Sequence, residues 1–168
     1  MSSASCARVG AELVRRFGTR DPFAIAEGLG IHIYRAEFHR LKGMYRVIKR
    51  RRCIFINSGL DGETARIVCA HEIGHDRLHR DLAKGDGLQE FTLYDLSTRP
   101  EYEANLVAAS ILIPDDEILP YIYEYGYSAE QIARTLSTDV NLVALKVTAL
   151  REEGHPLEPP PHDSRFLQ

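Results

Sequence analysis

The stretch IVCAHEIGHDRL, residues 67–78, decides the fold prediction. Apolar or small residues occupy nearly every position around its helical turns, which predicts a helix that is buried on most sides. His71, Glu72 and His75 form the pattern HExxH inside it. Two histidines four residues apart lie on one face of a helix, about 6 Å apart along its axis. Both imidazoles can therefore reach a single ion.

A metal explains these histidines better than chance or a surface position does. Burying two unpaired imidazoles in an apolar helix is costly, and zinc readily takes neutral imidazole nitrogens. Glu72, next to the first histidine, is placed to act as a general base instead of a ligand. The pattern thus predicts hydrolysis of a peptide or amide bond by a water that the metal activates. Iron(II) also suits two histidines and a carboxylate, but the spacing favours zinc.

A hydrolytic zinc site needs a third protein ligand, and a second predicted helix over 101–113 offers two glutamates. We expect Glu103 to be the ligand and Glu101 to be its solvent-exposed neighbour, because Glu103 leads a run of small alanines that can pack closely on the histidine helix. His79, one turn after His75, is a second candidate ligand or a hydrogen-bonding partner. An ordinary, partly buried histidine is the simpler interpretation of His79.

The remaining hydrophobic patterns predict an α+β fold, in which a small twisted sheet of about three strands packs on the HExxH helix. The other predicted elements are helices at 5–17 and 22–28, strands at 31–36, 44–48 and 53–56, and two short helices on either side of 137–141. We expect a domain over 1–127, a helix-turn-helix-like segment packed on it over 128–154, and a flexible tail over 155–168.

Composition fits one globular domain. Of the 168 residues, 44% are hydrophobic and 27% are charged, and the net charge is −3, so wholesale disorder and a uniformly basic nucleic-acid coat are both excluded. Three cysteines at irregular spacing indicate reduced thiols. Neither a signal peptide nor a membrane span is indicated, and we expect a cytoplasmic protein.

Five segments in order along the chain resemble one known family: DPFAIAEGLGIHI (21–33), LKGMYRV (41–47), IFIN (54–57), AHEIGHDRLH (70–79) and EYEANLVAASILIP (101–114). Together they resemble the ImmA/IrrE family of zinc-dependent endopeptidases over about residues 8–150. The resemblance implies a minimal zincin-like fold with one Zn²⁺ per chain. It assigns the metal ligands to His71, His75 and Glu103, and the catalytic role to Glu72.

The resemblance also implies a function. Members of this family are similar to proteins that cleave a DNA-binding repressor, in mobile elements or in stress responses, so the implied partner is a helix-turn-helix repressor. The alternative is a metal-binding regulator that binds DNA or protein without proteolysis. Direct DNA binding is not expected, because the second helix of the C-terminal segment offers only Lys146 and Arg151 to a DNA groove.

Substrate contacts can be predicted only in outline. A peptide substrate pairs with an exposed strand edge, and we expect this edge at Cys53, Ile54, Phe55 and Ile56. Tyr45 is a candidate oxyanion donor, with a half-buried strand tyrosine as the alternative. Two features have more than one interpretation. The tyrosines at 121, 123, 125 and 127 fit a strand or a helix end. The basic residues of one cluster fit a hairpin with a protected edge, a surface for an acidic partner or a site for a phosphate backbone: Lys42, Arg46, Lys49, Arg50, Arg51 and Arg52.

Overall fold

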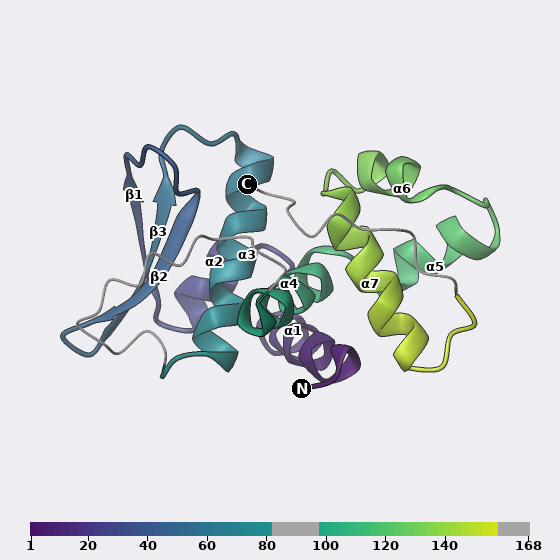
Figure 1. The fold of residues 1–168 in the computed structure, drawn as a ribbon, viewed down its shortest axis with the longest axis horizontal. Coiled ribbons are helices and arrows are strands. Elements are labelled where there is room, and N and C mark those ends of the chain that lie inside the picture. The colour runs from purple at the N-terminus through teal and green to yellow at the C-terminus, as the bar shows by residue number, and fades with distance from the viewer. Residues whose placement is uncertain (82–97, 158–168) are drawn as a thin grey trace.

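A three-stranded sheet lies at one side of the computed structural model, which describes residues 1–81 and 98–157 (Figure 1). The strands are β1 (His32–Ala36), β2 (Gly43–Ile48) and β3 (Arg51–Asn57), in the order β1-β3-β2. The central strand β3 runs parallel to β1 and antiparallel to β2. The predicted α+β class and three-stranded sheet are confirmed.

A tight turn joins β2 to β3. Lys49 and Arg50 both have positive φ, 47° and 67°, as a two-residue hairpin turn of the primed type requires. Helix α3 (Gly62–Leu78) covers one face of the sheet and contacts both β2 and β3. The helices of the described ranges lie on that side of the sheet, with α2 (Pro22–Gly28) beside β1 (Figure 1). The opposite face of the sheet therefore has no helical layer among the described residues.

Close helix packing positions the predicted site. Helix α4 (Arg99–Leu112) lies between α3 and α1 (Ser3–Phe17). A Cβ atom on Gly74 would lie 2.7 Å from the Ala104 Cα atom, and one on Gly10 would lie 2.6 Å from the Val107 carbonyl oxygen. Only glycine permits such an approach at these two points. Two glycines thus set the distance from α4 to its neighbours.

The C-terminal part of the chain is helical. It comprises α5 (Asp115–Tyr123), α6 (Ala129–Thr135) and α7 (Val140–Glu152). Helix α5 was not among the predicted elements; the tyrosines gather around its C-terminal end, where the rings of Tyr121 and Tyr127 stack 5.5 Å apart. A helix end, and not a strand, is therefore the correct interpretation of the tyrosine pattern.

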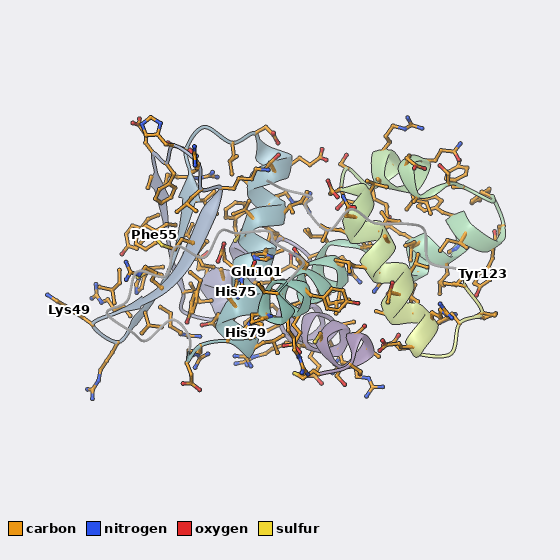
Figure 2. The ribbon with its side chains drawn as sticks, viewed as in Figure 1. Lys49, Phe55, His75, His79, Glu101 and Tyr123 are labelled. Atoms are coloured by element: carbon orange, nitrogen blue, oxygen red, sulfur yellow. The ribbon has the colours of Figure 1, made fainter. Side chains whose placement is uncertain are left out.

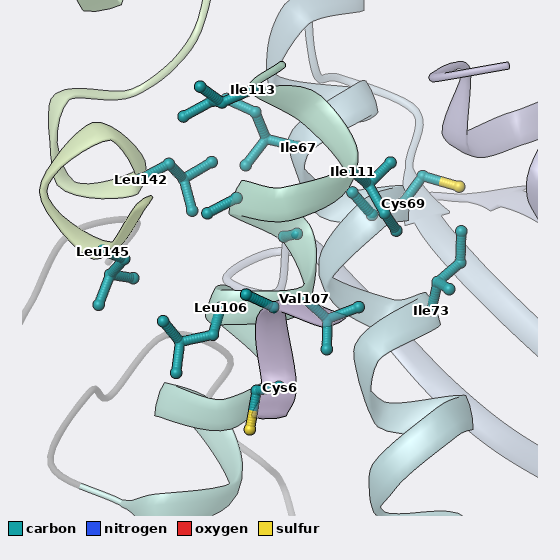
Figure 3. Packing of buried hydrophobic residues seen from close by; sticks show 14 of the residues in the cluster. Cys6, Ile67, Cys69, Ile73, Leu106, Val107, Ile111, Ile113, Leu142 and Leu145 are labelled. Carbon is teal, nitrogen blue, oxygen red and sulfur yellow. The ribbon is translucent and has the colours of Figure 1, made fainter. Parts of the chain in front are cut away.

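Helix α7 packs on α1 and α4, and the buried side chains of all three helices belong to one hydrophobic cluster (Figure 3). Lys146, predicted to be one of two basic residues available to DNA, is buried and pairs with Asp115. The predicted flexible tail also needs correction at its start, because Leu157 is buried in the core; residues 158–168 and the predicted loop at 82–97 lie outside the described residues.

None of the helices in the described part of the chain is long and apolar enough to cross a membrane.

Candidate metal centre

Helix α3 brings the two histidines of the HExxH pattern together. Asp61 caps its N-terminus by accepting a hydrogen bond from the Thr64 amide at 2.8 Å. The Nε2 atoms of His71 and His75 lie 2.9 Å apart, and the His71 side chain is fully buried. The predicted convergence of the two imidazoles on one point is confirmed.

Glu101, and not Glu103, forms a group with these histidines, and Figure 2 shows Glu101 next to His75. Its carboxylate oxygens lie 3.1 Å from His71 Nε2 and 3.3 Å from His75 Nε2. The expectation of an exposed Glu101 is wrong, because its side chain is only 3% exposed. The reason is the rotation of α4: Ala104 packs against Gly74 on α3, and Glu101 lies three residues before Ala104 on the same helix face. Glu103, about 200° further round than Glu101, points elsewhere.

The donor set fits a zinc ion. The ligand atoms of His71, His75 and Glu101 all lie within 4.8 Å of one another. Ligands bound tetrahedrally to zinc at about 2.0 to 2.1 Å are themselves about 3.3 Å apart, close to the measured 2.9, 3.1 and 3.3 Å. Two imidazoles and one carboxylate also match the chemistry of hydrolytic zinc sites, which keep a further position open.

Asn105 is a site residue that we did not predict. Its Oδ1 atom lies 2.9 Å from His71 Nδ1, and its side chain is fully buried. Because an amide oxygen can only accept, His71 carries its proton on Nδ1 and presents the Nε2 lone pair to the site. The available signal was the spacing: Asn105 follows Glu101 by four residues, and so shares its helix face.

A chain of hydrogen bonds supports His75 from behind. His75 Nδ1 lies 3.2 Å from His79 Nδ1, and His79 Nε2 lies 3.0 Å from Glu103 Oε2. Glu103 Oε1 also accepts from Arg99 Nε and from the amino group of Met1. The consistent proton order runs from His75 to His79 and from His79 to Glu103, which leaves His75 Nε2 free for a metal. His79 thus takes the predicted hydrogen-bonding alternative, and Glu103 acts on it.

The electrostatics favour an ionised Glu101 beside a neutral His75, whereas Glu101 raises the pKa of His71 although burial opposes this. In the metal-free chain burial alone would raise the pKa of Glu101, but contact with His71 and His75 holds that pKa well below its usual range. Burial is also the largest influence on His75 and lowers its pKa to about 4, with the neighbouring His71 acting in the same direction. His75 is therefore neutral at physiological pH, as a metal ligand must be.

Glu72 lies on the sheet side of the centre, where the sheet comes close to α3. Its side chain is 1% exposed, and its Oε1 atom has no hydrogen-bond partner in the part of the chain that the structure describes. A Cβ atom on Gly43 would lie 3.3 Å from this oxygen, so the first residue of β2 is close to it. Burial raises the pKa of Glu72 to about 8, partly opposed by His71. A carboxyl group with this pKa can accept and return a proton near neutral pH.

The phenol of Tyr45 is hydrogen-bonded to Asp76. Tyr45 Oη donates to Asp76 Oδ1 at 2.7 Å, one helical turn beyond Glu72, and Arg52 Nη1 donates to Asp76 Oδ2 at 3.0 Å. Burial, followed by the bond to Asp76, raises the pKa of Tyr45. This placement matches the alternative of a half-buried strand tyrosine. It does not support Tyr45 as the oxyanion donor.

The predicted substrate strand needs correction. Cys53, Ile54, Phe55 and Ile56 belong to β3, which pairs with β1 on one side and β2 on the other. A central strand has no free edge to offer a peptide. Strand β2 is at the edge of the sheet, and it begins at Gly43 beside Glu72.

Comparison with known proteins identifies a peptidase family. Residues 26–148 match the family model described as the IrrE N-terminal-like domain, a peptidase family. The chain is 33% identical over 110 residues to the "Uncharacterized immunity region protein 2" of Bacillus phage phi105, which covers 65% of this chain and 68% of that one. It is 29% identical over 130 residues to "Metallopeptidase ImmA" of Bacillus subtilis (strain 168), which covers 72% and 71%.

Proposed function

Because the chain belongs to the peptidase family described as the IrrE N-terminal-like domain, we propose that it is a zinc-dependent endopeptidase with one Zn²⁺ held by His71, His75 and Glu101. The observation that carries this proposal is the convergence within 4.8 Å of three donors from two helices, of which His71 and Glu101 are buried and His75 is partly buried. The unused oxygen of Glu72 next to them supports it, because a buried carboxylate needs a function or a partner.

The proposed reaction is hydrolysis of a peptide bond. A bound zinc ion supplies Lewis acidity, which polarises the scissile carbonyl and acidifies a water. Glu72 accepts a proton from the attacking water and passes it to the leaving amine. In the metal-free chain burial raises the pKa of Glu72 to about 8, and a zinc ion beside it would lower that pKa and favour the ionised form that accepts the proton. Asn105 and the pair His79–Glu103 keep the two imidazoles oriented while this happens.

We assign the substrate backbone to the outer edge of β2. An extended peptide added there would hydrogen-bond to Gly43–Ile48 by β-augmentation. The start of this strand lies beside Glu72, so the edge leads the peptide to the general base. Gly43 itself has no side chain that would separate the peptide from that carboxylate.

The proposed substrate is a DNA-binding repressor, cleaved at one site in the cytoplasm. Support comes from the two relatives, since one is called an immunity region protein and the other a metallopeptidase. The chain is then a regulator that acts by proteolysis. The alternative, a regulator that binds DNA through its C-terminal helices, loses support because Lys146 is buried against Asp115.

The test is to incubate the zinc-loaded protein with helix-turn-helix proteins encoded beside its gene and to identify new N-termini by mass spectrometry. The wild type should generate one new N-terminus in one of them, and Glu72→Gln should generate none while retaining its zinc. Zinc binding without any cleavage by either protein would favour the non-proteolytic regulator.

A further inference from the structure

One short region concentrates the positive charge of the chain. Residues 32–52 contain eight lysines or arginines and one acidic residue, Glu37, although the whole chain has a net charge of −3. This region is β1, β2 and the hairpin turn that leads into β3. Eight of the 21 lysines and arginines are therefore gathered at the sheet, at the end of the molecule away from α7 (Figure 1).

Aromatic rings lie on the same region. Tyr34 on β1 is paired with Phe55 on β3, and their rings stack with centroids 5.3 Å apart and an interplanar angle of 23°. His32, two residues before Tyr34 and so on the same face, stacks on it at 6.5 Å. Tyr34 is 43% exposed. The three rings form a partly exposed row across two strands.

This row occupies the sheet face opposite α3. Ile54 and Ile56 are fully buried on the α3 side, so Phe55 between them points the other way. Arg46 pairs with Cys53, which places Arg46 on the same outer face as Phe55. Figure 2 shows Phe55 on this face and Lys49 projecting from the tip of the hairpin.

Several basic residues of the hairpin remain exposed. Lys49, Arg50 and Arg51 are exposed, whereas Arg52 is occupied by Asp76. A hairpin that only needed charge to protect its edge would not require stacked, partly exposed rings on the adjoining face. The combination of an aromatic row with flanking cations is the arrangement that proteins use to hold unpaired bases and their phosphates.

We propose that the outer face of the sheet binds single-stranded nucleic acid. Bases stack on Tyr34 and Phe55, and Arg46, Lys49 and Arg50 contact the phosphates. Duplex DNA fits less well, because its bases are already stacked and paired, and an acidic protein would account for the charges but not for the rings. The site is separate from the metal centre, which lies beyond the opposite face of the sheet.

The test is fluorescence anisotropy with labelled oligonucleotides: a 12-mer of deoxythymidine, a 12-mer of uridine and a 12-base-pair duplex. Both single strands should bind more tightly than the duplex, with a log affinity that falls with log salt by about 0.7 per phosphate contacted. Equal affinity for the two single strands would mean that the site recognises bases and phosphates without distinguishing DNA from RNA. A higher affinity for one of them would identify DNA or RNA as the ligand.

Matched variants test the residues. Tyr34→Ala should weaken single-strand binding about tenfold, and Tyr34→Phe should restore it, while Tyr125→Ala, an exposed tyrosine near α5, should have no effect. Lys49→Glu with Arg50→Glu should lower the salt slope, while Arg134→Glu with Arg151→Glu, at exposed positions on α6 and α7, should change it little.

Three results with the oligonucleotides would overturn the inference: no binding at low salt, an equal loss of affinity in Tyr34→Ala and Tyr125→Ala, or a preference for the duplex. A labelled poly-glutamate peptide serves as a further probe, and binding to this peptide alone would indicate an acidic protein partner. Circular dichroism and zinc content of each variant show whether it has folded. Glu72→Gln should bind the oligonucleotides as the wild type does. The nucleic-acid proposal can therefore fail while the peptidase proposal stands, and the peptidase proposal can fail while the nucleic-acid proposal stands.

Discussion

The Nδ1 atom of His71 on α3 lies 2.9 Å from the Oδ1 atom of Asn105 on α4, and both side chains are fully buried. This single bond fixes the tautomer of a proposed metal ligand from a neighbouring helix. Partners of this kind usually determine a substantial part of metal affinity, because they hold the ring in its ligating orientation.

Asn105→Ala should therefore weaken zinc binding about 10- to 100-fold, as measured by competition with a chromophoric chelator. Asn105→Asp keeps an acceptor at the same place and should retain most of the affinity. If Asn105→Ala binds zinc as tightly as the wild type, the amide does not orient His71.

Glu101 and Glu103 form a matched pair for the third ligand. Glu101→Ala should purify with almost no zinc, because it removes the carboxylate that lies 3.1 Å from His71 Nε2. Glu103→Ala should keep about one zinc per chain with an affinity lowered about tenfold, because it acts on the metal ligands only through His79. Elemental mass spectrometry on proteins purified without added metal gives the answer, and zinc lost only from Glu103→Ala would reverse our assignment.

Gly74 tests the contact that aligns the two ligand-bearing helices. A Cβ atom there would lie 2.7 Å from the Ala104 Cα atom and 2.8 Å from its carbonyl oxygen, so Gly74→Ala must push α4 away from α3. We expect a loss of about 1 to 3 kcal/mol in unfolding free energy together with weaker zinc binding. Gly62→Ala, on the same helix with open space around it, should be neutral in urea unfolding and in zinc binding.

Tyr45 distinguishes a structural role from a catalytic one. Tyr45→Phe removes the hydrogen bond to the buried Asp76 carboxylate and should cost about 1 to 3 kcal/mol of stability. The kcat of the folded variant should change by less than about threefold, since loss of a true oxyanion donor costs about 100- to 1,000-fold. A large fall in kcat with unchanged stability would restore the oxyanion assignment.

Local patterns carried most of what the sequence could predict. The HExxH spacing places His71 and His75 on one face whatever surrounds the helix, and the alternating segments around Lys49–Arg50 make a hairpin. The order of the strands could not be predicted from local patterns. Nothing in the residues of β3 indicates that β1 pairs with the edge of β3 that β2 leaves free. The strand expected to receive a substrate consequently lies in the centre of the sheet.

The choice between Glu101 and Glu103 also depended on a tertiary contact. Both glutamates are on α4, and the alanines near Glu103 suggested a packed face there. The rotation of α4 is set instead by Gly74 meeting Ala104 and by Gly10 meeting Val107, two contacts that no single segment reveals. A search for polar residues that share a helix face with each glutamate would have favoured Glu101, because Asn105 follows it by four residues.

Glu72 leads to a pH-dependent prediction for the metal-free protein. Burial raises its pKa from an ordinary 4.5 to about 8 in the folded chain, so the folded state holds this proton more tightly than the unfolded state does. The stabilising effect is complete below about pH 4.5 and is lost as pH rises through about 8, because the native state must then bury an unneutralised carboxylate. Glu72→Gln has no such charge to bury.

Metal-free Glu72→Gln should accordingly match the metal-free wild type in thermal stability at pH 5 and exceed it at pH 9. The difference should reach about 3 °C or more in Tm, the shift that about 1 kcal/mol produces in a chain of this size. Calorimetry in the presence of a chelator measures both proteins over this range. A constant difference from pH 5 to 9 would mean that Glu72 is already ionised in the folded chain, and the proposed general base would then lack the raised pKa that suits it to return a proton to the leaving amine.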